Sequence, residues 1–240
     1  MSANSATRAT VTVTFLGYTI DQIFDLLEEK GVASVEDLQD MAANHDYAFS
    51  FLQDLPLGDY HRLEGYLYPD TYEFTTPQNP LYVINKMLVR FDEQFTEDMR
   101  QEVADSGRTI HEIVTIASMI EKETDGSDRA NIASVIYNRL NNPNGGTQGY
   151  LQIDATLAYI NGGKVPTEED KSIDSPYNTY LYKGLLLGQF PTPVWIHPGG
   201  YEPNSTSYYY YALGDDGVHH FFKTLREQQN FTATQELYNK

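Results

Sequence analysis

A glutamate lies within an apolar helical stripe near the middle of the chain. The period of 3.6 residues puts Glu121 in line with Ile110, Val114, Ala117 and Thr124. A carboxylate on such a face is unfavourable unless it is hydrogen-bonded, paired or protonated. Partial burial raises the pKa of a carboxyl group, which suits a general acid near neutral pH. Alternatively, Glu121 pairs with a buried arginine or a backbone amide and only holds the helix; spacing leaves both interpretations open.

Metal chemistry finds little support in the same region. His111-Glu112 begins a zinc-protease signature, but the second histidine would have to stand where Thr115 is. The six histidines are scattered along the chain, and His219-His220 beside a turn is typical of a solvated pair rather than of metal ligands. The sequence therefore predicts no metal site.

Composition excludes several classes of partner. The 240 residues carry a formal net charge of −18, which argues against nucleic acid and against adsorption to an anionic membrane surface. Cysteine is absent, so neither a disulfide framework nor a cysteine metal site is possible. The 19 tyrosines and 11 phenylalanines suit sugar or peptide contact, although packing is the more common use of such rings.

The elements before the glutamate divide into two parts. Alternation predicts a strand over Val11–Phe15, a capping box at Thr19 opens the first helix, and Ser34 caps the second. A short third helix is expected over Tyr47–Leu52. Pro56 and Gly58 then interrupt the pattern, and we place a domain boundary near residue 58.

The rest of the chain is predicted to be mixed, so the expected fold class is α+β. We expect an extended aromatic segment, five helices with a β-hairpin before the last, and loops between them. In chain order they are Leu63–Phe74, a helix from Pro80 to about Ala104, a helix over Thr109–Thr124, a helix capped by Asp128 and running to Leu140, a helix over Ala155–Ile160 capped by Asp154, hairpin strands Ser207–Leu213 and Val218–Phe222, and a last helix capped by Thr224.

Five ordered motifs resemble one known family. The stretches are EGYLYPDTY at Glu64–Tyr72, ASMIEKET at Ala117–Thr124, ASVIYNRL at Ala133–Leu140, LQID at Leu151–Asp154 and SPYNTY at Ser175–Tyr180. In this order they resemble the endolytic murein transglycosylases called MltG or YceG-like proteins, and Gly217–Thr224 resembles the closing hairpin of that family. The resemblance implies a YceG-like catalytic domain over 59–240, preceded by a small, shortened LysM-like α/β module over 1–58.

The resemblance also assigns roles to residues. It makes Glu121 the catalytic residue, in agreement with the helical-face argument. Glu123 belongs to the same motif and counts as a site residue, although we expect its role to be structural. The matched substrate-binding positions of the groove are Gln152, Asp154, Tyr177, Asn178, Thr179 and Tyr180. Asn138 and Arg139 are expected to tie helices together.

The implied reaction is lyase chemistry at a glycosidic bond. In the family, the β-1,4 bond between N-acetylmuramic acid and N-acetylglucosamine is cut without water, which leaves 1,6-anhydro ends and terminates or trims nascent glycan strands. A hydrolase would need two carboxylates, whereas this scheme needs only Glu121. No metal or organic cofactor is required. The expected partners are peptidoglycan glycan strands and cell-wall synthases, with no nucleic acid.

Two alternatives come from other function classes. A non-catalytic cell-wall binding protein would use the LysM-like module alone. A pyridoxal-phosphate enzyme is suggested by the aminodeoxychorismate-lyase label that relatives of the family have carried. Lys122, however, lies on the wrong helix face for the Schiff base, and no glycine-rich phosphate loop opens a helix.

The sequence departs from the family pattern in three places. The expected turn after the Ser175–Tyr180 motif is replaced by Gly184–Gln189, an Asn-Pro-Gly is replaced by His197–Gly199, and the following helix is expected to shrink to Gly200–Ser207. The family's N-terminal membrane helix is also missing before Val11. We therefore expect the natural protein to carry one such anchor, with residues 11–240 outside the cytoplasm.

Overall fold

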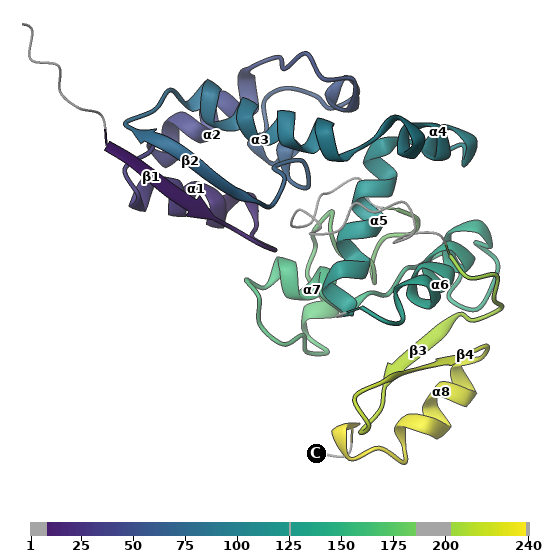
Figure 1. Ribbon diagram of the computed structural model, residues 1–240. Coiled ribbons are helices and arrows are strands. Elements are labelled where there is room, and N and C mark those ends of the chain that lie inside the picture. The colour runs from purple at the N-terminus through teal and green to yellow at the C-terminus, as the bar shows by residue number, and fades with distance from the viewer. Residues whose placement is uncertain (1–8, 125, 186–202, 239–240) are drawn as a thin grey trace, which may run out of the picture. The chain divides into compact units, whose positions relative to one another are not determined.

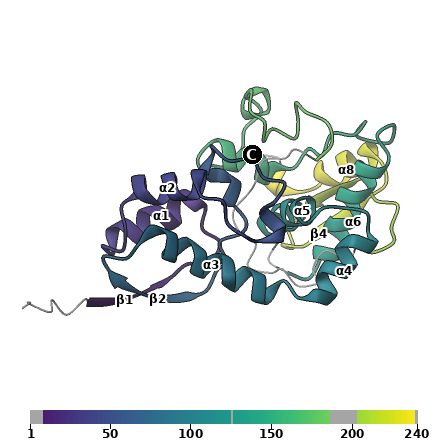
Figure 2. The same cartoon turned by 90° about the horizontal axis from the view of Figure 1, so that it is seen from above.

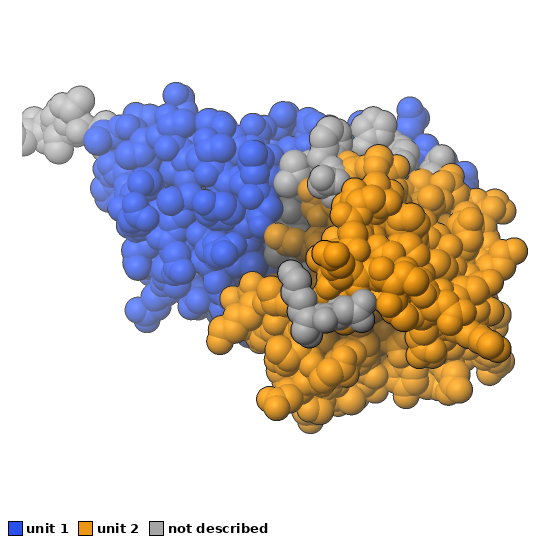
Figure 3. All heavy atoms as spheres, turned by 90° about the horizontal axis from the view of Figure 1, so that it is seen from below, with its two compact units in different colours: residues 1–110, 189–196 blue, residues 111–188, 197–240 orange. Residues whose placement is uncertain are grey.

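A computed structural model describes residues 9–124, 126–185 and 203–238 (Figure 1). The chain divides into two compact units, drawn in two colours in Figure 3: unit 1 comprises residues 1–110 and 189–196, and unit 2 comprises 111–188 and 197–240. Both units combine helices with a two-stranded antiparallel sheet, which confirms the predicted α+β class.

A β-ribbon supports unit 1. Strands β1 (Ala9–Thr14) and β2 (Thr71–Thr76) run antiparallel, with Val13 opposite Tyr72. Alternation buries Val13, Tyr72 and Phe74 on one face, and helices α1 (Ile20–Glu29) and α2 (Val35–Asn44) lie on one side of the ribbon in Figure 2. The boundary predicted at residue 58 falls inside this unit because β2 pairs with β1.

The predicted helix starts of unit 1 are confirmed. Thr19 and Gln22 form the capping box of α1, and the Ser34 side chain accepts a hydrogen bond from the backbone of α2. The short third helix is the 3₁₀ turn η1 (Ser50–Leu52). These local signals succeed because capping involves residues only three positions apart.

The prediction of one continuous helix from Pro80 to Ala104 is wrong. The segment forms two helices, α3 (Pro80–Gln94) and α4 (Glu97–Asp105). Phe95 leaves the helical region at ψ 82°, and the Thr96 side chain then accepts a hydrogen bond from the Met99 backbone to begin α4.

The segment between η2 (Tyr60–Leu63) and β2 joins the helices of unit 1. Glu64 is 1% exposed, and both of its carboxylate oxygens accept the Ile20 N–H at 3.0 Å, at the start of α1. Arg62 donates to the Ala42 carbonyl at 2.8 Å near the end of α2. Of the segment predicted as extended, only Thr71 onward forms a strand.

Unit 2 is built around one buried helix. Every residue from Ile113 to Ile120 of α5 is buried. The hairpin β3–β4 follows in the predicted place, with Tyr211 opposite Phe221, and α8 packs on both strands. The elements are α5 (Ile110–Glu123), α6 (Arg129–Asn141), α7 (Asp154–Ile160), η3 (Asp170–Ser172), β3 (Tyr210–Leu213), β4 (His219–Phe222), α8 (Leu225–Thr232) and η5 (Glu236–Tyr238). Among the residues described, no helix combines the length and the apolar character that a bilayer crossing requires.

Candidate active site

The continuous burial of α5 ends at Glu121. The residues before it are buried on all sides of the helix, so the apolar stripe is one part of a wholly buried surface. The Glu121 side chain is 19% exposed. A carboxyl group at this rim is partly desolvated and still open to solvent.

Arg129, the first residue of α6, forms an ion pair with Glu121. Its Nη2 lies 3.3 Å from Glu121 Oε2, and the two side chains are 22% and 19% exposed. Burial raises the pKa of Glu121, while the charges of Arg129 and Lys122 oppose that rise. The arrangement supports a carboxyl group that keeps its proton at a higher pH than an ordinary glutamate does. Arg129 can stabilise the carboxylate once the proton has left.

Glu123, the last residue of α5, has different partners from Glu121. Its Oε1 accepts the Ala155 N–H at 2.9 Å, and its Oε2 accepts the Tyr211 hydroxyl at 2.7 Å. Burial raises the pKa of Glu123, and these two hydrogen bonds oppose the rise. Glu123 thereby joins α5 to the start of α7 and to β3, which fits the structural role expected for it.

The predicted groove positions Gln152 and Asp154 lie at the start of α7. Gln152 has φ 50°, an uncommon conformation for a residue with a side chain, and its N–H donates to the Thr179 carbonyl at 3.1 Å. The prediction that Asp154 caps α7 is wrong: the N-cap is Ile153, and the Asp154 carboxylate instead accepts the Tyr180 hydroxyl at 2.5 Å.

These contacts bring two of the sequence motifs together. Leu151–Asp154 and Ser175–Tyr180 lie side by side through the backbone bond of Gln152 and the side-chain bond of Asp154. Burial, followed by the charge of Asp154, raises the pKa of Tyr180, so its hydroxyl remains a donor.

Two predicted substrate contacts are buried inside the loop itself. Asn178 is 0% exposed; its amide nitrogen donates to the Ile173 carbonyl at 2.8 Å, and its oxygen accepts the Tyr180 N–H at 2.9 Å. The Thr179 hydroxyl accepts the Ile153 N–H at 2.9 Å. Both side chains hold the backbone, while Tyr177, half-buried with its ring 5.2 Å from that of Tyr159, lies nearer the surface.

The sequence did not indicate a network at the α5–α6 junction. Asp128 stands at the N-cap of α6 without capping it, because its carboxylate accepts the Thr124 hydroxyl and contacts His219 Nδ1 at 2.6 Å. Asp128 and His219 are 14% and 13% exposed, so the expectation of a solvated histidine pair is wrong for His219. His220, 39% exposed beside Asp216, does fit that expectation.

Asn138 and Arg139 bind α6 to the hairpin rather than to another helix. The Asn138 amide donates to the Tyr208 carbonyl at 2.9 Å, and Arg139 Nε donates to the Tyr209 carbonyl at 2.8 Å. The guanidinium lies 5.7 Å from the centre of the Tyr211 ring and also donates to the Leu151 carbonyl. The prediction of a tie is confirmed, and its partner is corrected.

The departures from the family pattern fall mostly outside the described residues. Of Gly184–Gln189, only the first two residues are described, and the Gly184 N–H donates to the Gly149 carbonyl at 2.8 Å. His197–Gly199 is outside the described residues altogether. Of the shortened helix expected over Gly200–Ser207, the described residues 203–207 are not helical.

Comparison with known proteins identifies the chain's relatives. The model of the YceG-like family matches residues 2–234. The chain belongs to the YceG-like family. A solved YceG-like protein from Listeria monocytogenes is similar, with a TM-score of 0.74 and 30% identity over 91% of this chain and 74% of that one.

Two curated relatives carry the name endolytic murein transglycosylase. The Bacillus subtilis protein is 36% identical over 171 residues, which are 70% of this chain and 46% of the relative. The protein of Streptococcus pneumoniae strain D39 is 32% identical over 200 residues, 74% of this chain and 35% of the relative. The chain thus spans less than half the length of these two relatives.

Proposed function

We propose that this chain carries the transglycosylase activity of an endolytic murein transglycosylase. It cuts the β-1,4 bond between N-acetylmuramic acid and N-acetylglucosamine without water and leaves 1,6-anhydro ends. The observation that carries the proposal is the Glu121 carboxyl group at the rim of α5, with a raised pKa and Arg129 at 3.3 Å. The names of the curated relatives support the same activity.

One carboxyl group can serve both halves of this reaction. Protonated Glu121 donates its proton to the glycosidic oxygen as the bond from C1 of the muramoyl residue to that oxygen breaks. The resulting carboxylate takes the proton of the muramoyl C6 hydroxyl, whose oxygen forms the new bond to C1. Glu121 ends protonated again, so protons balance without water. Arg129 stabilises the carboxylate between the two steps.

The remaining site residues divide by burial and by contacts. Gln152, Asp154, Tyr177 and Tyr180 are exposed or half-buried, and we propose that they orient the sugar rings. Asn178 and Thr179 are buried, and Glu123 is half-buried with both carboxylate oxygens engaged, so these three act on the substrate through the backbone that they hold. This division assigns no second carboxylate to the reaction, because Asp154 already accepts the Tyr180 hydroxyl.

Family membership supports a proposal for unit 1 and for the cellular setting. We propose that the β1–α1–α2–β2 order of unit 1 is a LysM-like arrangement with an insertion before β2. Action on nascent glycan strands implies an extracytoplasmic position beside cell-wall synthases. An N-terminal membrane helix preceding residue 11 remains a prediction from the resemblance.

The products test the proposal. Purified glycan strands are digested in water labelled with ¹⁸O, and the new ends are identified by mass spectrometry. We expect 1,6-anhydro ends without incorporated label. Labelled reducing ends would show hydrolysis and would make Asp154 a candidate for the base. Binding of strands without any new ends would favour the non-catalytic alternative.

A further inference from the structure

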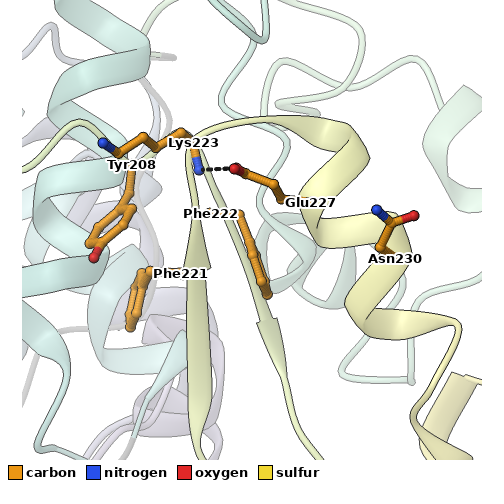
Figure 4. Close-up of a pocket in the computed structure, with 6 residues that line it drawn as sticks. All are labelled: Tyr208, Phe221, Phe222, Lys223, Glu227 and Asn230. Atoms are coloured by element: carbon orange, nitrogen blue, oxygen red, sulfur yellow. Dashed lines mark hydrogen bonds between the residues drawn. The ribbon is translucent and has the colours of Figure 1, made fainter.

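A cavity of about 440 Å³ opens at the hairpin of unit 2 (Figure 4). We call it the hairpin pocket; it is lined by Tyr208, Phe221, Phe222, Lys223, Glu227 and Asn230. Tyr208 and Phe221 lie on one side of β4, and Phe222 lies on the other. Aromatic faces with an amine and an amide beside them suit a ligand that is part apolar and part charged.

A row of rings connects the hairpin pocket to the end of α5. The Tyr208 and Phe221 ring centres are 5.7 Å apart, and those of Phe221 and Tyr211 are 6.2 Å apart. The Tyr211 hydroxyl then donates to Glu123 at 2.7 Å. Each ring in the row thus contacts the next, and the last is hydrogen-bonded to Glu123 of the motif that contains Glu121.

Charge distinguishes the ligand further. Lys223 is exposed, and among the described residues its ammonium group makes no ion pair within 4.0 Å. The neighbouring Glu227 accepts the backbone N–H groups of Lys223 and Thr224 through Oε2 at 3.0 Å and 2.9 Å, and its charge also attracts the Lys223 ammonium group. In Figure 4 the Lys223 side chain extends toward Tyr208, on the side of β4 where Phe221 lies. Lys223 thus supplies a local positive charge beside the aromatic face, which suits an anionic group of the ligand.

We infer that the hairpin pocket is a subsite for the peptide-bearing muramoyl residue of a glycan strand, with Lys223 binding a stem-peptide carboxylate and Tyr208 covering the sugar or peptide beside it. The inference rests on the proposed function, because it takes the glycan strand as the substrate. It adds a requirement for the stem peptide that the chemistry at Glu121 does not impose.

Binding measurements can isolate this subsite from cleavage. In a Glu121→Gln background, affinity is measured for soluble glycan strands with intact stem peptides and for the same strands stripped of them. We expect Lys223→Gln to weaken binding of peptide-bearing strands by about 10-fold, the scale of a charge-assisted hydrogen bond, and to leave stripped strands unaffected. Tyr208→Leu should weaken binding of the peptide-bearing strands as well.

Arg226→Gln is the matched control, because it removes the same charge from the exposed start of α8 without lining the pocket. Equal losses for Lys223→Gln and Arg226→Gln would overturn the inference, as would equal losses on intact and stripped strands. Unchanged melting temperatures show that each variant is folded.

The two proposals can fail separately. If the unsubstituted chain makes no anhydro ends but Lys223→Gln still weakens binding selectively, the proposed reaction is wrong and the subsite stands as a binding site. If anhydro ends form and the Lys223 substitution has no selective effect, only the subsite is wrong.

Discussion

Glu121 and Glu123 lie two residues apart at the end of α5, yet their carboxyl groups meet different surroundings. Glu121 is 19% exposed and lies 3.3 Å from the guanidinium of Arg129. Glu123 is half-buried and accepts hydrogen bonds from the Ala155 N–H and the Tyr211 hydroxyl at 2.9 Å and 2.7 Å. Burial raises the pKa of both groups.

The comparison separates a carboxyl group that can exchange its proton from one that holds the fold. A general acid needs a raised pKa together with access to the reacting atoms. Glu121 has both, because it stands at the rim. Glu123 also has a raised pKa, but both of its carboxylate oxygens already accept hydrogen bonds, and its partners come from two other elements. A raised pKa therefore identifies both residues, and only geometry assigns their roles.

The largest expected effect is on cleavage by Glu121→Gln. Loss of the only proposed acid and base should reduce kcat by about 100-fold to 10,000-fold, the usual contribution of such a group. The fold should remain, because glutamine keeps the size and removes a partly buried charge. Release of anhydro-muropeptides and the melting temperature measure the two effects.

Glu169→Gln is the matched control, an exposed residue of the same unit that should retain full activity. If the Glu121 variant retained a tenth or more of the wild-type rate, the catalytic assignment would be wrong. An unfolded Glu121 variant would favour the interpretation that this residue only holds the helix.

Glu123→Gln should lower stability more, and cleavage less, than Glu121→Gln does. An amide has one acceptor oxygen, so it can accept from Ala155 while its nitrogen donates to the Tyr211 hydroxyl oxygen, and two hydrogen bonds to a charged acceptor become neutral ones. We expect a loss of about 1–2 kcal/mol in the free energy of unfolding, the scale by which charge-assisted hydrogen bonds exceed neutral ones. Cleavage should fall less than in Glu121→Gln. Urea denaturation measures the loss, and a stable but inactive variant would instead make Glu123 the catalytic group.

The pH dependence of stability sharpens the comparison further. A carboxyl group whose pKa is raised by folding binds its proton more tightly in the folded state. Its stabilising contribution is complete below the ordinary value of 4.5 and is lost as the pH rises through the raised value. Urea denaturation of wild type and both glutamine variants from that pH upward should show a decline in wild type that each substitution reduces. A decline of the same slope in all three proteins would show that neither group is its source.

Local patterns predicted the helices because their causes are local. Capping residues specified the starts of α1, α2 and α8, and periodicity specified α5, from residues three or four positions apart. The apolar stripe correctly indicated that Glu121 lies at a buried helix, but the helix is buried on all sides and not on one stripe alone. Thr115 and Ser118 are also buried within α5, since their hydroxyls donate to the carbonyls of His111 and Thr115 at 2.8 Å. What distinguishes Glu121 is the end of burial, which a period cannot reveal.

The partners of the site could not be predicted from spacing. Tyr211 and Glu123 are 88 residues apart in sequence, and His219 and Asp128 are 91 apart. Pairing of β2 with β1 likewise joins Thr14 to Thr71 across 57 residues. Such contacts depend on how whole elements pack, so a local pattern carries no information about them. The motif resemblance supplied the residues, but not which of them, such as Asn178, are buried.

The smallest expected effect concerns His219, which contacts Asp128 on one side and the Tyr211 ring on the other. Its Nδ1 is 2.6 Å from Asp128, which also accepts the Thr124 hydroxyl and immediately precedes Arg129 in the chain. His219→Gln should leave Asp128 poorly paired and loosen the junction that carries Arg129. We expect a loss of about 1 kcal/mol in stability and only a few-fold fall in cleavage, because no contact to Glu121 itself is removed. His220→Gln is the control, because it removes a contact to Asp216 in the hairpin turn rather than to Asp128, and it should leave cleavage unchanged. Equal effects of the two histidine substitutions would mean that the Asp128 contact does not position Arg129, and the guanidinium would then depend on its own contacts alone.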